Sequence, residues 1–268
     1  TPSERYRIVF DPREEGSLLG TLRRAWWNAR QIQESLSIEA SGALNNLEEK
    51  FARVKFKPEG DETVLALATQ RLCADTASSV AEFFGLAEAT MLSDRGWNFC
   101  RLGQQLERAV ITGNAGVTVF KSLAKRAGKS GVSADHPVEI ELSAFLRMLA
   151  SRDAYHRLYR MRAEPVPVLR MLYASEEVPR SVRKCLAECA RLLGDDGDTS
   201  PGVVRSREVI AAVPRLIDGA DWEKFFAGPA LDPARLDELV GLLELINART
   251  HAIHDVVTDG FINHQLPH

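Results

Sequence analysis

The sequence predicts an all-α fold, and three features of it support this prediction. Apolar residues recur about every 3.6 positions through most of the 268 residues. Ser, Asp, Gly and Pro residues stand at the ends of these periodic segments, as helix caps and turns require. No stretch alternates apolar and polar residues well enough to predict a strand. With 45% hydrophobic and 26% charged residues, the chain can bury a sizeable core.

The first expected helix covers residues 18–36. Turn and cap signals precede it at Asp11-Pro12 and Gly16-Ser17. Its apolar residues fall on one stripe, formed by Leu18, Leu22, Ala25, Trp26, Ala29, Ile32 and Leu36.

Three further helices are expected before residue 125. They cover residues 41–54, residues 63–84 with Gly85 as the C-cap, and residues 88–122 with a bend near Gly113 and Gly116. A basic loop is expected at 125–137, followed by a helix at 139–162 that Pro165 and Pro167 end. After it, the pattern predicts helices at 182–193, 205–217, 221–226 and 232–260, with an acidic linker at 194–202.

Two segments of the chain resemble each other, Tyr6–Trp26 and Arg170–Ala190. When Ser17 is aligned with Ser181, each copy has a short apolar run, an acidic turn, a Ser cap and an amphipathic helix. Helical periodicity alone supplies part of this match, so chance similarity is the alternative. The expected architecture is one all-helical domain, a bundle of two related multi-helix units of which the first is incomplete. Residues 1–90 would form the partial first unit, residues 91–204 the second unit, and residues 205–268 the C-terminal helices.

Composition and motifs exclude several functions. The net charge of −3 does not indicate nucleic-acid binding, and no apolar run approaches the roughly 18 residues that a membrane span needs. Gly128-Lys129-Ser130 resembles the end of a phosphate-binding loop, but Leu123 stands where that motif requires Gly, and no strand precedes it. We therefore expect no ATP binding and no cofactor.

The cysteines and histidines give no clear metal site. Cys73, Cys100, Cys185 and Cys189 form no Cys-x-x-Cys pair and are expected to be reduced core thiols, which favours a cytoplasmic location. His251 and His254 lie three residues apart and could face one side of a helix as metal ligands. Because no second copy of this element occurs, surface histidines are the simpler interpretation and no metal is expected.

The most informative segment is Met91–Asn114. On a helical wheel Glu107 falls at the edge of an apolar arc, and Gly103 one turn earlier would let another helix approach. We therefore expect Glu107 to be largely buried and paired with Arg101 or Arg147, so that removing its carboxylate would cost roughly 3–5 kcal/mol. Two interpretations of it stay open, a structural ion pair between helices and a ligand-binding or catalytic site made of Glu107, Arg108, Arg101 and Arg147.

This segment resembles the signature helix of the Alpha-E family. The shared residues are Gly96-Trp97, Phe99, Arg101-Leu102-Gly103 and Leu106-Glu107-Arg108-Ala109. Arg95 departs from the acid that is usual there, and Gln104-Gln105 replace basic and aromatic residues. The resemblance covers nearly the whole chain. Other residues that match the family are Trp27-Asn28-Ala29-Arg30, Ser37, Glu39, Leu44-Asn45, Phe145-Leu146-Arg147, the run Ala154–Tyr159 and the run Val178–Val182. The Trp residues that are usual near Ser41 and Leu142 are missing.

The resemblance implies an all-helical bacterial protein that works with circularly permuted ATP-grasp ligases or transglutaminase-like proteins. It implies a role in making or modifying peptides or amides, and we expect an accessory or interaction domain without activity of its own. The alternative is an enzyme that uses Glu107 and nearby Arg residues to bind or process an amino-acid or peptide substrate. A cleft around Glu107 with unpaired polar groups would favour the enzyme.

The repeat also predicts an incomplete first unit. A piece matching Met91–Glu164 would precede Thr1 if the first unit were whole, so we expect the chain to be a fragment or, alternatively, a shorter family member. A truncated helical unit leaves an apolar face uncovered. The surface around Trp26 and Trp27 is therefore expected to meet another polypeptide: a second copy, the missing segment or an ATP-grasp partner.

Overall fold

The structure is a computed structural model that describes residues 1–11, 13–14, 16–54, 61–128, 135–194, 200–228 and 230–261. These residues are 81% helical and contain no strand, which confirms the predicted all-α class. The chain divides into two compact units, Thr1–Ser93 and Asp94–His268. The second unit thus holds both residues 94–204 and the C-terminal helices. The predicted repeat relation between units stays a prediction.

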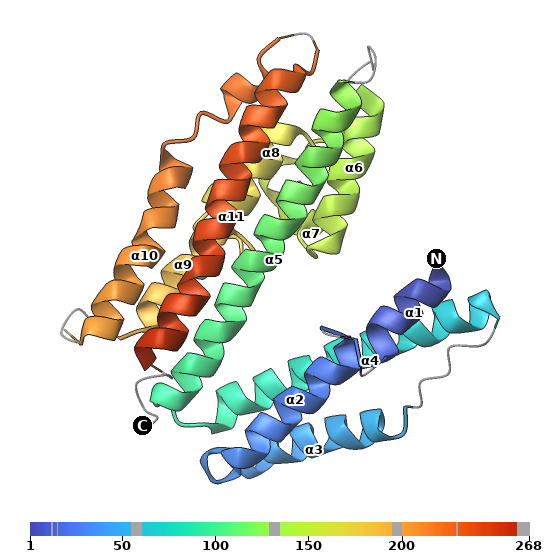
Figure 1. The fold of residues 1–268 in the computed structure, drawn as a ribbon, viewed down its shortest axis with the longest axis vertical. Coiled ribbons are helices and arrows are strands. Elements are labelled where there is room, and N and C mark those ends of the chain that lie inside the picture. Colours follow the sequence, from blue (N-terminus) through green and yellow to red (C-terminus); the bar gives the residue numbers. More distant parts are fainter. Residues whose placement is uncertain are drawn as a thin grey trace. The chain divides into compact units, whose positions relative to one another are not determined.

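The first unit is built on one long helix. Its elements are α1 (Pro2–Phe10), α2 (Leu18–Gln31), a 3-10 turn (Gln33–Ser35), α3 (Ile38–Ala52) and α4 (Glu62–Thr90) (Figure 1). α1 and α3 both pack along α4, and α2 contacts α1 and α3. Ser17 and Ser37 begin α2 and α3, because each hydroxyl accepts a hydrogen bond at 3.1 Å from a backbone N–H of the first turn. The small core consists of Tyr6, Phe10, Leu19, Leu47, Phe51, Leu65 and Leu72.

The second unit is a larger bundle around two long helices. Its elements are α5 (Arg95–Ala127), α6 (Asp135–Met148), α7 (Arg152–Tyr159), α8 (Pro165–Leu169) with a π-helical turn (Arg170–Ala174), α9 (Val182–Leu192), α10 (Pro201–Asp218), a 3-10 turn (Glu223–Phe226) and α11 (Pro233–Phe261). α5 and α11 lie side by side, α9 packs against α5, and α10 packs against α11 (Figure 1). Their facing apolar side chains form one continuous core.

Two glycines of α5 make room for side chains from other elements. α5 continues as one helix through Gly113 and Gly116, where the sequence suggested a bend. A Cβ at position 113 would overlap the amide of Asn247 on α11, and one at position 116 would overlap the hydroxyl of Tyr173 in the π-helical turn. The glycines therefore serve close packing.

Several predicted helix boundaries are wrong. Gly85 lies inside α4, which continues to Thr90 because tertiary packing overrides the cost of one glycine. The helix predicted for 139–162 is two helices separated at Ala150, whose φ of 50° interrupts the helical backbone. Pro165 begins α8, where a proline at the first helical position loses no hydrogen bond.

Replacing Ala150 by Gly is expected to stabilise the protein by about 0.5–1 kcal/mol. The left-handed backbone at this position costs a residue with a Cβ roughly 1–2 kcal/mol, which glycine avoids. Glycine also loses more conformational freedom on folding than alanine does, and this loss offsets part of the gain. Urea unfolding of both proteins measures the difference. A clear loss of stability would show that the Cβ of Ala150 contributes more than its backbone strain.

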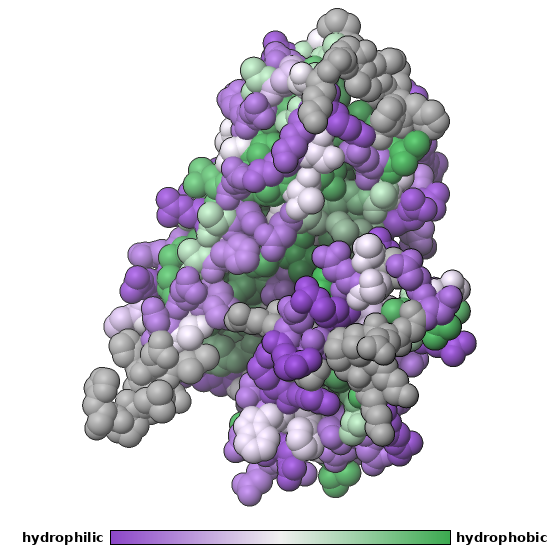
Figure 2. Space-filling model, turned by 45° about the vertical axis from the view of Figure 1, so that its right-hand side comes forward, coloured by the Kyte–Doolittle hydropathy of each residue, from purple (hydrophilic) through white to green (hydrophobic). Residues whose placement is uncertain are grey.

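One face of the molecule is mainly polar. Hydrophilic side chains spread over much of the face shown in Figure 2, with apolar residues among them. Among the described residues, no helix combines the length and the apolar character that crossing a membrane requires.

Candidate functional site

The apolar face of α2 is poorly covered. Only Leu19 and Gly20, both in the first turn of α2, are buried. Further along the helix, Leu22 and Trp26 are half-buried, and Trp27 is 61% exposed. The helix that matches α2 in the proposed repeat is α9, and its apolar positions Val182, Cys185, Leu186 and Cys189 are all fully buried. α2 therefore lacks the cover that α9 receives within its own unit.

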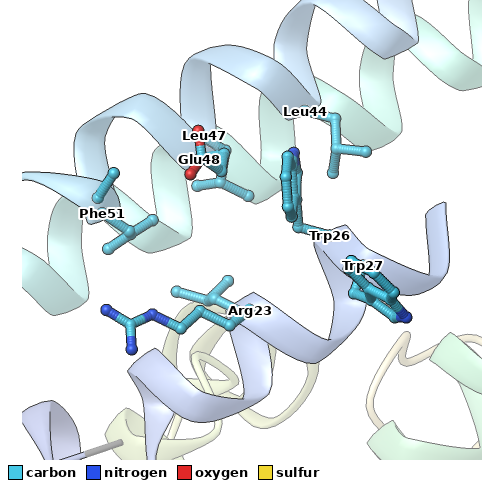
Figure 3. Close-up of a pocket in the computed structure, with 9 residues that line it drawn as sticks. Arg23, Trp26, Trp27, Leu44, Leu47, Glu48 and Phe51 are labelled. Carbon is cyan, nitrogen blue, oxygen red and sulfur yellow. The ribbon is translucent and has the colours of Figure 1, made fainter. Parts of the chain in front are cut away.

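An apolar groove lies along this face, between α2 and α3. It encloses about 270 Å³ and is lined by Leu22, Arg23, Trp26, Trp27, Leu44, Leu47, Glu48, Phe51 and Ala52. In Figure 3 the ring of Trp26 extends from α2 toward Leu44 on α3, and Trp27 leaves α2 in a different direction. Arg23 and Glu48 place one charge of each sign at its walls. We call this hollow the α2–α3 groove.

Trp26 has an unused hydrogen-bond donor. Its indole Nε1 is buried, and no acceptor for it is found among the described residues. The guanidinium carbon of Arg30 lies 5.0 Å from the centre of the Trp26 ring, within the range of a cation–π contact. The groove thus offers an aromatic surface, a free N–H and two flanking charges, which are features of surfaces that bind another polypeptide.

The predicted burial of Glu107 is wrong, because this side chain is exposed. α5 packs against both α9 and α11, so its buried stripe is rotated from the arc drawn on the wheel and includes the polar residues Gln105 and Thr112. Because these two buried residues are polar, the apolar pattern of the sequence did not indicate the centre of the buried stripe. Glu107 and Gly103 lie beside it, in contact with solvent.

The expected partners of Glu107 are also elsewhere. Arg101 on α5 pairs with Glu188 on α9, with 3.9 Å between nitrogen and oxygen. Arg147 on α6 is exposed. No ion pair joins either arginine to Glu107 in the described part of the chain, so these residues do not form one buried site.

Replacing Glu107 by Ala is now expected to change the free energy of unfolding by less than about 0.5 kcal/mol. An exposed carboxylate without an ion pair in the described structure contributes little to stability. Chemical denaturation of wild type and variant provides the measurement. A loss of several kcal/mol would restore the buried ion pair that the sequence suggested.

Arg108 lies beside the turn that leads into α9. Thr112, one helical turn further along α5, donates its hydroxyl to the carbonyl of Arg180 at 2.9 Å. The thiol of Cys185 donates to the carbonyl of Pro179 at 3.4 Å. Burial raises the pKa of the Cys185 thiol to about 11, although the nearby charges of Arg108 and Arg180 act in the opposite direction. The sequence offered one signal for Arg180, its place in a Pro-Arg-Ser turn just before an amphipathic helix.

The histidine pair lies on the surface of α11. His251 and His254 are both exposed. The Nε2 atom of His251 is 3.5 Å from the Asn114 side-chain oxygen, and the Nδ1 atom of His254 is 3.6 Å from the Asp255 carboxylate. Within the described ranges, no three His, Cys, Asp or Glu residues are grouped so that they could hold a metal ion. Lys129 and Ser130 of the rejected phosphate loop lie outside the described residues.

These helices define the chain as an all-helical protein with an open apolar groove between α2 and α3. Residues 2–262 match the Alpha-E family, described as a predicted alpha-helical domain with a conserved ER motif. The chain belongs to this family. Glu-Arg occurs at Glu4-Arg5 and at Glu107-Arg108, and the second lies in the Leu-Glu-Arg-Ala run of α5. No curated protein and no solved structure matches the chain.

Proposed function

We propose that this Alpha-E chain is an interaction domain that binds an ATP-grasp-type ligase and assists it in the synthesis or modification of peptides or amides. The observation that carries this proposal is the α2–α3 groove, in which an aromatic face of α2 stays open. The chain itself is proposed to perform no chemistry. Its contribution is to hold or position the ligase or the ligase's substrate.

The energetics of the groove favour a protein partner. Full burial of a large apolar side chain contributes about 1.5–3 kcal/mol, and Trp residues are frequent among the few that dominate an interface. Trp27 and the uncovered edge of Trp26 supply two such side chains next to each other. A partner that covers them and accepts a hydrogen bond from the Trp26 indole would also satisfy its buried donor.

Co-purification with a circularly permuted ATP-grasp ligase from the same source organism tests the proposal. Wild-type chain is expected to bind the ligase and to stimulate its ATP turnover, with no turnover by the chain alone. Trp27→Ala should weaken binding at least about tenfold, as expected for a central interface tryptophan. The matched control is Val64→Ala on α4, because Val64 is also 61% exposed and lies outside the groove.

Two results would contradict the proposal. If Trp27→Ala and Val64→Ala bind the ligase equally well, the groove is not the interface. If the isolated chain hydrolyses ATP or ligates amino acids, and Glu107→Gln abolishes that activity, the enzyme alternative replaces the accessory function.

A further inference from the structure

The half-buried arginines of the second unit fall into two groups. The first group has oxygen partners: Arg101 with Glu188, Arg126 with Glu141, Arg183 with Asp218, Arg235 with Asp232, and Arg207 with the carbonyl of Gly194. The second group is Arg108 and Arg180, whose side chains have no ion pair or hydrogen bond in the described structure. A partly desolvated guanidinium without a partner is unfavourable. These two cations therefore lack a counter-charge that their neighbours have.

The two unpaired arginines come from different elements, which are joined close to both residues. Arg108 and Thr112 are one turn apart on the same face of α5, and the hydroxyl of Thr112 holds the carbonyl of Arg180 at 2.9 Å. The thiol of Cys185, in the first turn of α9, donates to the carbonyl of Pro179, the residue before Arg180, at 3.4 Å. Both arginines therefore extend from backbone that lies next to the start of α9, and a bound anion there would supply the counter-charge that each of them lacks.

The start of α9 adds further donors at the same place. Arg180 and Ser181 immediately precede this helix of 11 residues. Ser181 is its N-cap residue, but the Ser181 hydroxyl makes no capping hydrogen bond, unlike Ser17 and Ser37 in the first unit. This hydroxyl is fully buried and has no partner among the described residues. The first N–H groups of α9 thus lack the side-chain acceptor that N-cap residues usually provide.

We propose that Arg108, Arg180 and the first turn of α9 form a binding site for a small oxyanion, a carboxylate or a phosphate group. Guanidinium groups bind such anions through paired charge-assisted hydrogen bonds, and the N-terminus of a helix adds backbone donors and a favourable dipole. The site assigns a role to Arg108 of the Glu-Arg motif. It lies in the second unit and does not depend on the α2–α3 groove, so either proposal can fail without the other.

Nuclear magnetic resonance of the arginine side-chain N–H groups tests this site. Sodium acetate and sodium phosphate are titrated into the full chain at constant ionic strength, with chloride as the balancing anion. The signals of Arg108 and Arg180 are expected to shift in a saturable way. Arg108→Gln and Arg180→Gln should each weaken binding about tenfold, whereas Arg249→Gln, at an exposed position on α11, should not change it.

The two probes distinguish the sources of the oxyanion. If the shifts of the arginine signals saturate with acetate, the ligand of the site is a carboxylate. If they saturate with phosphate alone, the ligand is a phosphate group. Shifts that grow linearly with both probes, or equal affinity in the three variants, would overturn the proposal.

A measurement without any anion separates binding from structure. Thermal unfolding of Arg108→Gln should occur at or above the wild-type temperature, because the variant removes a half-buried cation that has no ion pair in the described structure. A clear fall in that temperature would mean that Arg108 supports the fold as a structural residue, and the site would then be wrong.

Discussion

Replacing Gly116 by Ala is expected to lower the free energy of unfolding by about 2 kcal/mol. The new Cβ would overlap the Tyr173 hydroxyl and lie 3.1 Å from the Cζ atom of that fully buried ring. Overpacking of this kind costs up to about 3 kcal/mol, and the better helix propensity of alanine returns roughly 1 kcal/mol. Urea unfolding measures the difference.

Two further variants make this test specific. Gly103 lies on the same helix with nothing within 4 Å of its Cβ position, so Gly103→Ala should stabilise the protein by about 0.5–1 kcal/mol. Tyr173→Phe removes the overlapping atom, together with a buried hydroxyl that has no partner in the described structure. The double variant should therefore recover part of the loss. If Gly116→Ala is as stable as Gly103→Ala, the close approach of Tyr173 to α5 is wrong.

The largest expected loss of stability comes from Phe120→Ala, at about 3–5 kcal/mol. Phe120 is 0% exposed in the C-terminal part of α5, and its ring lies 6.3 Å from the ring of Phe226. Truncating a buried phenylalanine removes its burial and leaves a cavity that neighbouring residues cannot fill. Ile111 on the same helix is 41% exposed, so Ile111→Ala should cost less than about 1 kcal/mol. Equal losses in the two variants would contradict the packing of α5 in this core.

The all-α class could be predicted because helical periodicity is a local property of the sequence. Ser17 and Ser37 begin helices for the same local reason, since a hydroxyl at this position caps the first turn. The break at Ala150 and the continuation of α4 through Gly85 could not be read in this way. Both depend on packing against distant helices, which overrides local propensity.

The candidate sites were predictable to different degrees. The stripe that contains Trp26 indicated an apolar face that needs a neighbour, and the structure places that face in an open groove. The orientation of α5 was not predictable from its sequence, because Gln105 and Thr112 are polar residues inside the buried stripe. The apolar arc therefore placed Glu107 in the core, although it is exposed. The position of Arg180 next to Thr112 of α5 depends on the tertiary fold and has no local signal in the sequence.

Hydrogen–deuterium exchange with and without a circularly permuted ATP-grasp ligase from the same source organism tests the proposed interaction function most directly. If the α2–α3 groove is the interface, ligase binding should slow exchange in residues 18–31 and 38–52 of the wild-type chain. Trp27→Ala should lose that protection at the same ligase concentration. Binding accompanied by protection only outside these two helices would contradict the account, and so would the absence of binding.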